Sequence, residues 1–228
     1  MLRLLLFVLL PLLLLLGPSL WVQWVLRRHA QEDPALPATG GELAADLLHA
    51  FRLHDVRIEE TRLGDHYDPE TRTVCLAPAI FRGRSLTAIA TAAHEVGHAL
   101  QHATHYQPLL TRSALAKRAL RLQRLSAWLF VLSPLLLLAS RSPAPALLLV
   151  TVALLSTMLT TLIHVITLPV EFDASFRRAL PILADLHRMG PDDLRTVRRI
   201  LFACALTYVS ESVIALVTLR FWLRLLAR

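Results

Sequence analysis

Four long apolar runs divide the chain into polar and apolar segments. They lie at about 2–26, 122–140, 146–168 and 200–219. A helix of about 20 apolar residues is long enough to cross a lipid bilayer. Pro134 interrupts the second run, but membrane helices tolerate proline. The pattern therefore predicts a mainly α-helical membrane protein with about four transmembrane helices.

The N-terminal run favours an anchor over 1–28 that is retained in the mature protein. The run is longer than a typical signal-peptide core, and no small-residue cleavage pattern follows it. Trp21 and Trp24 stand near its end, where aromatic belts occur, and Arg27 and Arg28 follow. We therefore expect the first segment to remain as a transmembrane helix.

The second and third runs are predicted to form a transmembrane hairpin over 122–168. Only a short loop with two prolines, at 140–145, separates them. The C-terminal segment, 200–228, is predicted to be a transmembrane helix followed by a tail. Glu211 lies near the middle of its apolar run, and a carboxylate at that depth is costly, so full spanning by this run stays open.

The polar segment 29–121 has the pattern of a small α+β domain. Thr39 begins a capping-box sequence and predicts a helix there. Short stretches at 56–59 and 73–76 alternate or are rich in β-branched residues, which predicts two strands. A further helix is expected to begin near Ser85.

That helix carries the sequence His94-Glu95-Val-Gly-His98. Histidines four residues apart lie on one face of a helix, where both imidazoles can bind one Zn²⁺ ion. The opposite face is apolar, so we expect it to pack in a core while the histidines face a cleft. Glu95 is placed to take a proton from a water on the metal. The motif therefore predicts a catalytic zinc site.

A catalytic zinc ion needs a third protein ligand. The metzincin pattern is absent, because Gln101 and Thr104 occupy the positions of its glycine and third histidine. His102 continues the histidine spacing but lies too far along the helix axis to share the metal. A better candidate is Glu171, just after the third run, with Pro169 suited to the first turn of a new helix. The alternative is that Glu171 only compensates the helix dipole.

Topology supports Glu171, because a two-span hairpin returns the chain to the side of the membrane that it left. The polar segments 29–121 and 169–199 therefore lie on one side. Most of the arginines lie in or beside these segments, which predicts a cytoplasmic location. Both chain ends are then expected outside, provided that the run at 200–219 spans.

Composition and charge exclude several other classes of protein. Hydrophobic residues make up 55% of the 228 residues and charged residues 18%, which excludes a disordered chain. Cys75 and Cys204 are the only cysteines, so a disulfide scaffold is excluded as well. The net charge is +7, and the arginines that supply most of the positive charge flank the apolar runs. We therefore expect the chain to contact anionic lipid headgroups rather than nucleic acid.

Several stretches together resemble the YugP-like neutral zinc metallopeptidases, a family of bacterial membrane zincins. They lie at 65–74, 83–86, 92–102, 167–175 and 205–209. The resemblance implies a gluzincin-like site with His94, His98 and Glu171 as zinc ligands and Glu95 as the base. It also implies a plan similar to that of the HtpX-type membrane peptidases. Those relatives carry an acidic residue four positions after the ligand glutamate, where this chain has Ser175.

The sequence therefore predicts a zinc metalloendopeptidase with one Zn²⁺ per chain. Its expected surroundings are a bacterial inner membrane, with the catalytic side cytoplasmic and polypeptides, including membrane proteins, as substrates. The strand at 73–76 is expected to pair with an extended substrate. Candidates for a supporting or oxyanion-binding role are Asp173, His102, Tyr208, His66 and His164.

Two other functions remain open at this point. One is a zinc-binding membrane scaffold or chaperone that does not hydrolyse peptides, which the intact Glu95 disfavours. The other is a transporter, suggested by His164 and Glu211 within apolar runs. The sequence shows no internal repeat of the kind on which many transporters are built. The oligomeric state is not predicted.

Overall fold

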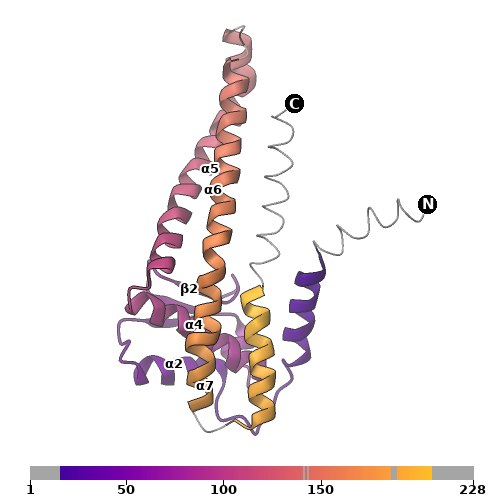
Figure 1. Ribbon diagram of the computed structural model, residues 1–228, viewed down its shortest axis with the longest axis vertical. Helices are drawn as coiled ribbons and strands as arrows, with labels where there is room; N and C mark the ends of the chain where they lie inside the picture. Colours follow the sequence, from indigo (N-terminus) through magenta and orange to yellow (C-terminus); the bar gives the residue numbers. More distant parts are fainter. Residues whose placement is uncertain (1–15, 141, 143, 186–188, 207–228) are drawn as a thin grey trace, which may run out of the picture.

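The computed structural model describes residues 16–140, 142, 144–185 and 189–206. A long pair of helices rises from a smaller domain of short helices and strands (Figure 1). The pair consists of α5 (Gln107–Ser140) and α6 (Ala144–Phe172), which pack side by side in opposite directions. The chain therefore turns back between these two helices, and α5 runs without a break from the polar segment into the apolar one.

Among the described residues, one helical stretch, Ala144–Asp185, is long and apolar enough to cross a membrane. Four transmembrane helices are therefore not confirmed. Helix is present at 16–28 and at 191–206, within or beside the first and fourth apolar runs. The remaining parts of those runs, with Tyr208 and Glu211, lie outside the described residues.

The small domain contains the predicted α+β elements and two that the sequence did not predict. In chain order they are α2 (Gly40–Ala50), β1 (Arg57–Glu60), β2 (His66–Asp68), β3 (Thr73–Leu76), α3 (Pro78–Phe81) and α4 (Leu86–Ala103). Thr39 caps α2 in a complete capping box with Glu42, as predicted. The additional elements are the short strand β2 and the single-turn helix α3, which begins at Pro78.

The three strands form one sheet in the order β1-β3-β2. β3 is parallel to β1, with Ile58 opposite Val74, and antiparallel to β2, with Tyr67 opposite Val74. Both sides of β3 are therefore already hydrogen-bonded. The prediction that this strand pairs with a substrate is wrong, because a peptide can add only to a free edge. The edge strand beside α4 is β2.

Helix α4 begins after Ser85, whose hydroxyl accepts a hydrogen bond from the backbone N–H of Ala88. The helix is buried on nearly all sides, rather than on one apolar face as predicted. It packs against α2, the sheet and the segment that follows α6. At Gly97 an added Cβ atom would lie 2.8 Å from the carbonyl oxygen of Ala174, so only glycine permits this close approach.

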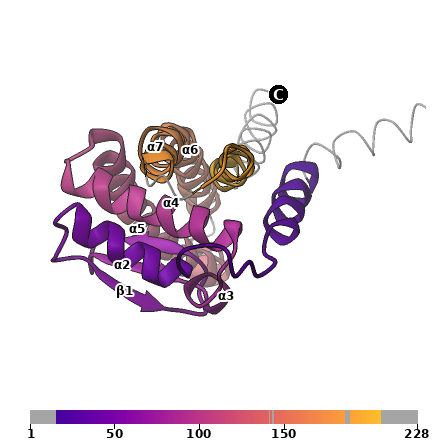
Figure 2. The same cartoon turned by 90° about the horizontal axis from the view of Figure 1, so that it is seen from below.

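α6 continues directly into the π-helical segment η1 (Asp173–Ala179) and then α7 (Leu180–Asp185). Pro169 lies inside α6, so the prediction that it starts a new helix is wrong. The helices at 16–28 and 191–206 stand beside this continuous rod (Figure 2). One hydrophobic core joins these helices to α2 and α4. It contains Val25, Leu47, Ile89 and Leu201.

Candidate metal centre

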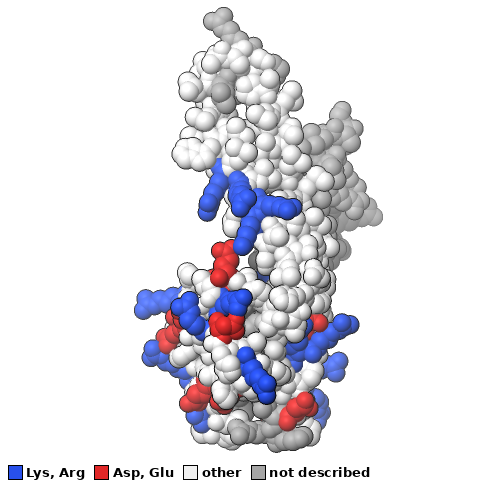
Figure 3. Space-filling model, turned by 90° about the vertical axis from the view of Figure 1, so that its left-hand side faces the viewer, with Lys and Arg blue, Asp and Glu red and all other residues white. Residues whose placement is uncertain are grey.

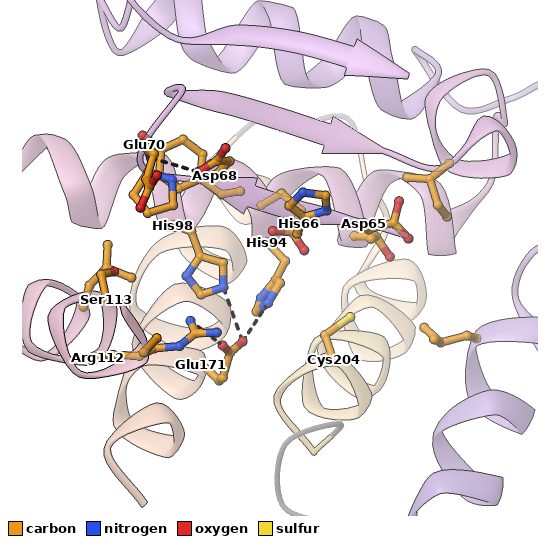
Figure 4. A pocket seen from close by; sticks show the side chains of 18 of the residues that line it. Asp65, His66, Asp68, Glu70, His94, His98, Arg112, Ser113, Glu171 and Cys204 are labelled. Atoms are coloured by element: carbon orange, nitrogen blue, oxygen red, sulfur yellow. Dashed lines mark hydrogen bonds and ion pairs between the residues drawn. The ribbon is translucent and has the colours of Figure 1, made fainter. Parts of the chain in front are cut away.

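Three buried side chains from two helices meet at one point. His94 and His98 come from α4, and Glu171 comes from the last turn of α6. Glu171 Oε2 lies 3.1 Å from His94 Nε2 and 3.3 Å from His98 Nε2 (Figure 4). One ligand atom from each residue lies within 4.8 Å of the other two. Two imidazoles and one carboxylate are a donor set that zinc accepts, with a fourth position left for water.

A chain of hydrogen bonds fixes the imidazole of His98. The Gln101 amide Nε2 donates to Val170 O at 2.8 Å and to Asp173 Oδ2 at 2.9 Å. Its Oε1 must therefore accept from His98 Nδ1, which lies 2.9 Å away. Because Nδ1 is the donor to Gln101, Nε2 is the ring nitrogen left to bind a metal ion once it gives up its own proton. At the other end of this series of hydrogen bonds, Arg178 Nε donates to Asp173 Oδ2 at 2.8 Å.

His94 is oriented in the same way by Ser175. The Ser175 hydroxyl donates to the carbonyl oxygen of Leu201 at 3.1 Å. It is therefore an acceptor for His94 Nδ1 at 3.0 Å, so Nε2 is the ring nitrogen that faces Glu171 and is placed to bind a metal ion. Leu201 belongs to the helix at 191–206, so this helix also takes part in positioning the first ligand.

Glu171 has an environment that keeps it ionised without a metal. Burial alone would raise its pKa, but the imidazoles of His98 and His94 outweigh burial and hold the pKa below its ordinary range. In return, the Glu171 carboxylate overcomes the effect of burial on His98 and raises the pKa of His98 to about 9. The second oxygen, Oε1, accepts from Arg112 Nη1 at 3.3 Å. The metal-free site therefore holds a proton that a zinc ion must displace.

Glu95 follows the first histidine and is only 6% exposed. Burial raises the pKa of its carboxyl group, against the attraction of His94 and His98. Its carboxylate makes no hydrogen bond or ion pair with the part of the chain that the structure describes. It lines the same cleft as the three candidate ligands, so it is available to a water or a substrate there.

The cleft in front of these residues has a volume of about 570 Å³. Its walls come from the end of the helix at 16–28, the segment 65–70 around β2, α4 and the first turns of α5. Lys117 on α5 forms an ion pair with Glu70, with 2.9 Å between Nζ and Oε1, and this pair joins two of the walls. On the surface, basic and acidic side chains gather near the base of the apolar helix pair (Figure 3).

Comparison with known proteins agrees with this arrangement. Residues 4–227 match the model of a family described as "Putative neutral zinc metallopeptidase". The chain belongs to this family. It is also 33% identical over 207 residues to "Putative membrane protease YugP" of Bacillus subtilis, an alignment that covers 88% of each chain. No solved structure matches the chain.

Membership of this zinc metallopeptidase family confirms the resemblance seen in the sequence. The other predicted site residues fall into different places. Asp173 touches Gln101 and therefore supports His98 indirectly. His66 lines the cleft, with its Nδ1 bonded to Gly64 O at 2.9 Å.

The remaining candidates do not lie at the centre. His102 Nδ1 is 2.8 Å from the hydroxyl of Tyr67 and does not line the cleft. His164 lies within α6, in the apolar helix pair, and also does not line the cleft. Tyr208 lies outside the described residues.

Three contributors were not predicted from the sequence: Gln101, Ser175 and Arg112. Gln101 is three residues after His98, so helical spacing places it near that histidine, but its role depends on α6 lying alongside. Ser175 stands where the HtpX-type relatives carry an acidic residue, and this position was the available signal for its role. Arg112 carries no local signal, because only the fold brings α5 to Glu171.

Proposed function

We propose that this protein is a membrane-bound zinc-dependent endopeptidase. The observation that carries the proposal is the convergence of His94, His98 and Glu171 in one cleft beside Glu95. Among the residues that the structure describes, the Glu95 carboxylate has no hydrogen bond or ion pair. Three protein ligands with an adjacent carboxylate are the arrangement of a hydrolytic zinc site rather than a closed structural one. The zinc metallopeptidase family supports the same function.

When bound, a zinc ion would lower the pKa of a coordinated water and polarise a carbonyl group. The protein's own side chains supply the remaining steps. Glu95 accepts the proton of the attacking water on a carboxylate oxygen and returns it to the nitrogen of the departing amine.

The edge strand β2 is the element that we expect to position the substrate. β2 has β3 as its hydrogen-bonded neighbour on one side only, and the segment 65–70 lines the cleft. An extended polypeptide can add there as a further strand, with its scissile carbonyl directed toward Glu95. Arg112 and His66 also line the cleft and are candidates to stabilise the developing oxyanion.

The membrane setting is part of the proposal. The stretch Ala144–Asp185 reaches from the apolar hairpin to Glu171 and beyond, so the metal centre would lie close to the lipid surface. The similar YugP protein is described as a membrane protease. We propose the cytoplasmic face of a bacterial inner membrane as the location of the site, and polypeptides at or in that membrane as its substrates.

The test is zinc content and casein cleavage by detergent-purified full-length protein. Wild type should bind about one zinc per chain and cleave. Glu95→Gln should retain zinc and lose cleavage, whereas Glu171→Ala should lose zinc as well. Glu59→Gln, an exposed position on β1, is the matched control and should behave as wild type.

Two results would overturn the proposal. Full zinc occupancy with no cleavage of casein or of a membrane-protein substrate would favour the non-hydrolytic zinc scaffold. A wild-type protein that binds no zinc would remove the basis for both functions and would reopen the transporter class.

A further inference from the structure

A second cavity, of about 520 Å³, lies away from the metal cleft and shares no lining residue with it. Its lining residues come from α6, η1 and the helices at 16–28 and 191–206. Figure 2 shows how these helices are arranged. Its lining combines only two kinds of side chain, aromatic rings and arginines. The proposed peptidase chemistry uses none of them.

The aromatic part is a continuous cluster. Phe172 and Phe176 stack with ring centroids 5.7 Å apart, and both contact Phe202. Trp21 completes the cluster edge-on, with its ring 6.0 Å from that of Phe202. Phe172 is 38% exposed and Phe202 is 40% exposed, so the cluster offers apolar surface that the described protein does not cover.

The cationic part is one face of the helix at 191–206. Arg195, Arg198 and Arg199 are spaced so that they project from the same side. Asp192 forms an ion pair with Arg195. The guanidinium groups of Arg198 and Arg199 make no ion pair or hydrogen bond with the described residues.

The arginines also disfavour the protonated, positively charged form of the nearby His29. Burial lowers the pKa of His29, and the positive charges of Arg199 and Arg28 lower it further. Arg199 and Arg28, on two different helices, therefore both add to the positive potential at this imidazole. A bound anion would relieve this concentration of positive charge.

The aromatic rings and the arginines follow one another in the same order as the acyl chains and the phosphate group of a phospholipid. Along the helix at 191–206, the arginines precede Phe202, which lies within the fourth apolar run. Phe172 ends α6 and Phe176 follows it in η1, so Phe172 is the nearer of the two to the apolar hairpin. The helix at 191–206 rises in the direction of the hairpin (Figure 1), so Phe202 lies nearer the apolar end than Arg198 and Arg199 do.

We propose that this cavity binds an anionic phospholipid. The phosphate accepts hydrogen bonds from Arg198 and Arg199, and an acyl chain covers Phe172, Phe176 and Phe202. Arginine donates two parallel hydrogen bonds to a phosphate, and tryptophan is favoured at the boundary between headgroups and acyl chains. The site binds phosphatidylglycerol more tightly than phosphatidylcholine, whose headgroup carries no net charge.

The test is equilibrium binding of phosphatidylglycerol and phosphatidylcholine to full-length protein in a neutral detergent, followed by native mass spectrometry. Wild type should retain phosphatidylglycerol selectively. The double variant Arg198→Gln/Arg199→Gln should bind it at least tenfold more weakly. Arg121→Gln/Arg124→Gln, an equal loss of charge on α5, should bind it as wild type does. Zinc content should stay the same in all three proteins, which shows that the variants are folded.

Three results would overturn the proposal. An equal loss in both double variants would show general attraction to a basic surface. Equal retention of phosphatidylcholine would exclude recognition of the anionic headgroup. Complete displacement of phosphatidylglycerol by millimolar inorganic phosphate would identify a site for free phosphate instead of a lipid.

Discussion

Replacing Gln101 by methionine tests whether the hydrogen-bond chain behind His98 tunes metal binding. Gln101 is 0% exposed, and methionine has a similar length without an amide, so the substitution leaves little empty space. It removes the acceptor at 2.9 Å from His98 Nδ1 and the donor to Val170 and Asp173. Loss of such an outer partner costs about 10–100-fold in metal affinity, or about 1.4–2.7 kcal/mol.

The same substitution also lowers the stability of the metal-free protein. The Val170 carbonyl and the Asp173 carboxylate both lose a hydrogen bond in a buried place, at a cost of about 1–3 kcal/mol. Arg178 still pairs with Asp173, which keeps the loss within this range. Affinity and stability must therefore be measured separately.

The assay is competition for zinc against a chelator of known affinity, combined with chemical denaturation of the metal-free protein. Thr104→Ala is the control, because it removes a contact of Arg178 and leaves the side-chain hydrogen bonds of Gln101 in place. We expect weak zinc binding by Gln101→Met and wild-type affinity for the control. A folded Gln101→Met protein whose zinc affinity lies within twofold of wild type would refute the role of Gln101.

Three further predictions concern the same centre. Ser175→Ala removes the acceptor for His94 Nδ1 and should weaken zinc binding about tenfold in the same competition assay, and an unchanged affinity would contradict this. Gly97→Ala places a methyl group against the backbone of Ala174 and should lower the free energy of unfolding by about 1–3 kcal/mol. An unchanged free energy of unfolding would show that α4 and η1 can move apart without cost. Because the metal-free site holds its proton on His98 up to a pKa of about 9, zinc affinity should rise about tenfold per pH unit between pH 6 and 8. A flat profile over that range would show that no proton is displaced.

The local parts of the structure were predictable from short-range patterns. The capping box at Thr39 and the helix start at Ser85 depend on neighbouring residues, and both are confirmed. The pairing of His94 with His98 follows from helix geometry alone. The meeting of these histidines with Glu171 could also be predicted, because two antiparallel helices between them return the chain to the end from which it left.

The predictions from sequence failed where a residue or a segment suits two different places in a fold. Proline suits the first turn of a helix but is also tolerated within long apolar helices, and Pro169 takes the second position. The segment at 73–76 had the composition of a strand, but composition does not distinguish an edge strand from a central one. β2, with three residues, is too short to produce a readable alternation.

The π-helical segment explains why Asp173 could not be placed from the sequence. In a regular α-helix, residues two apart point about 200° away from each other, so Glu171 and Asp173 would not both be expected to face α4. The structure changes to π-helical hydrogen bonding at Asp173, immediately after the ligand. Asp173 and Ser175 are both buried there and support one histidine each, Asp173 by way of Gln101. Such segments are frequent at functional sites.

This arrangement makes the metal centre dependent on the hairpin. His94, His98 and Gln101 precede α5 and α6, whereas Glu171 and Ser175 follow them, so neither half has the complete donor set with its supporting bonds. A metal ion that binds only the assembled site stabilises the assembly, by about 2.7 kcal/mol at a hundred times its dissociation constant. Zinc binding and correct packing of the hairpin against the small domain are therefore one linked equilibrium. A disturbance of the apolar helices far from the cleft should weaken the zinc site through that link.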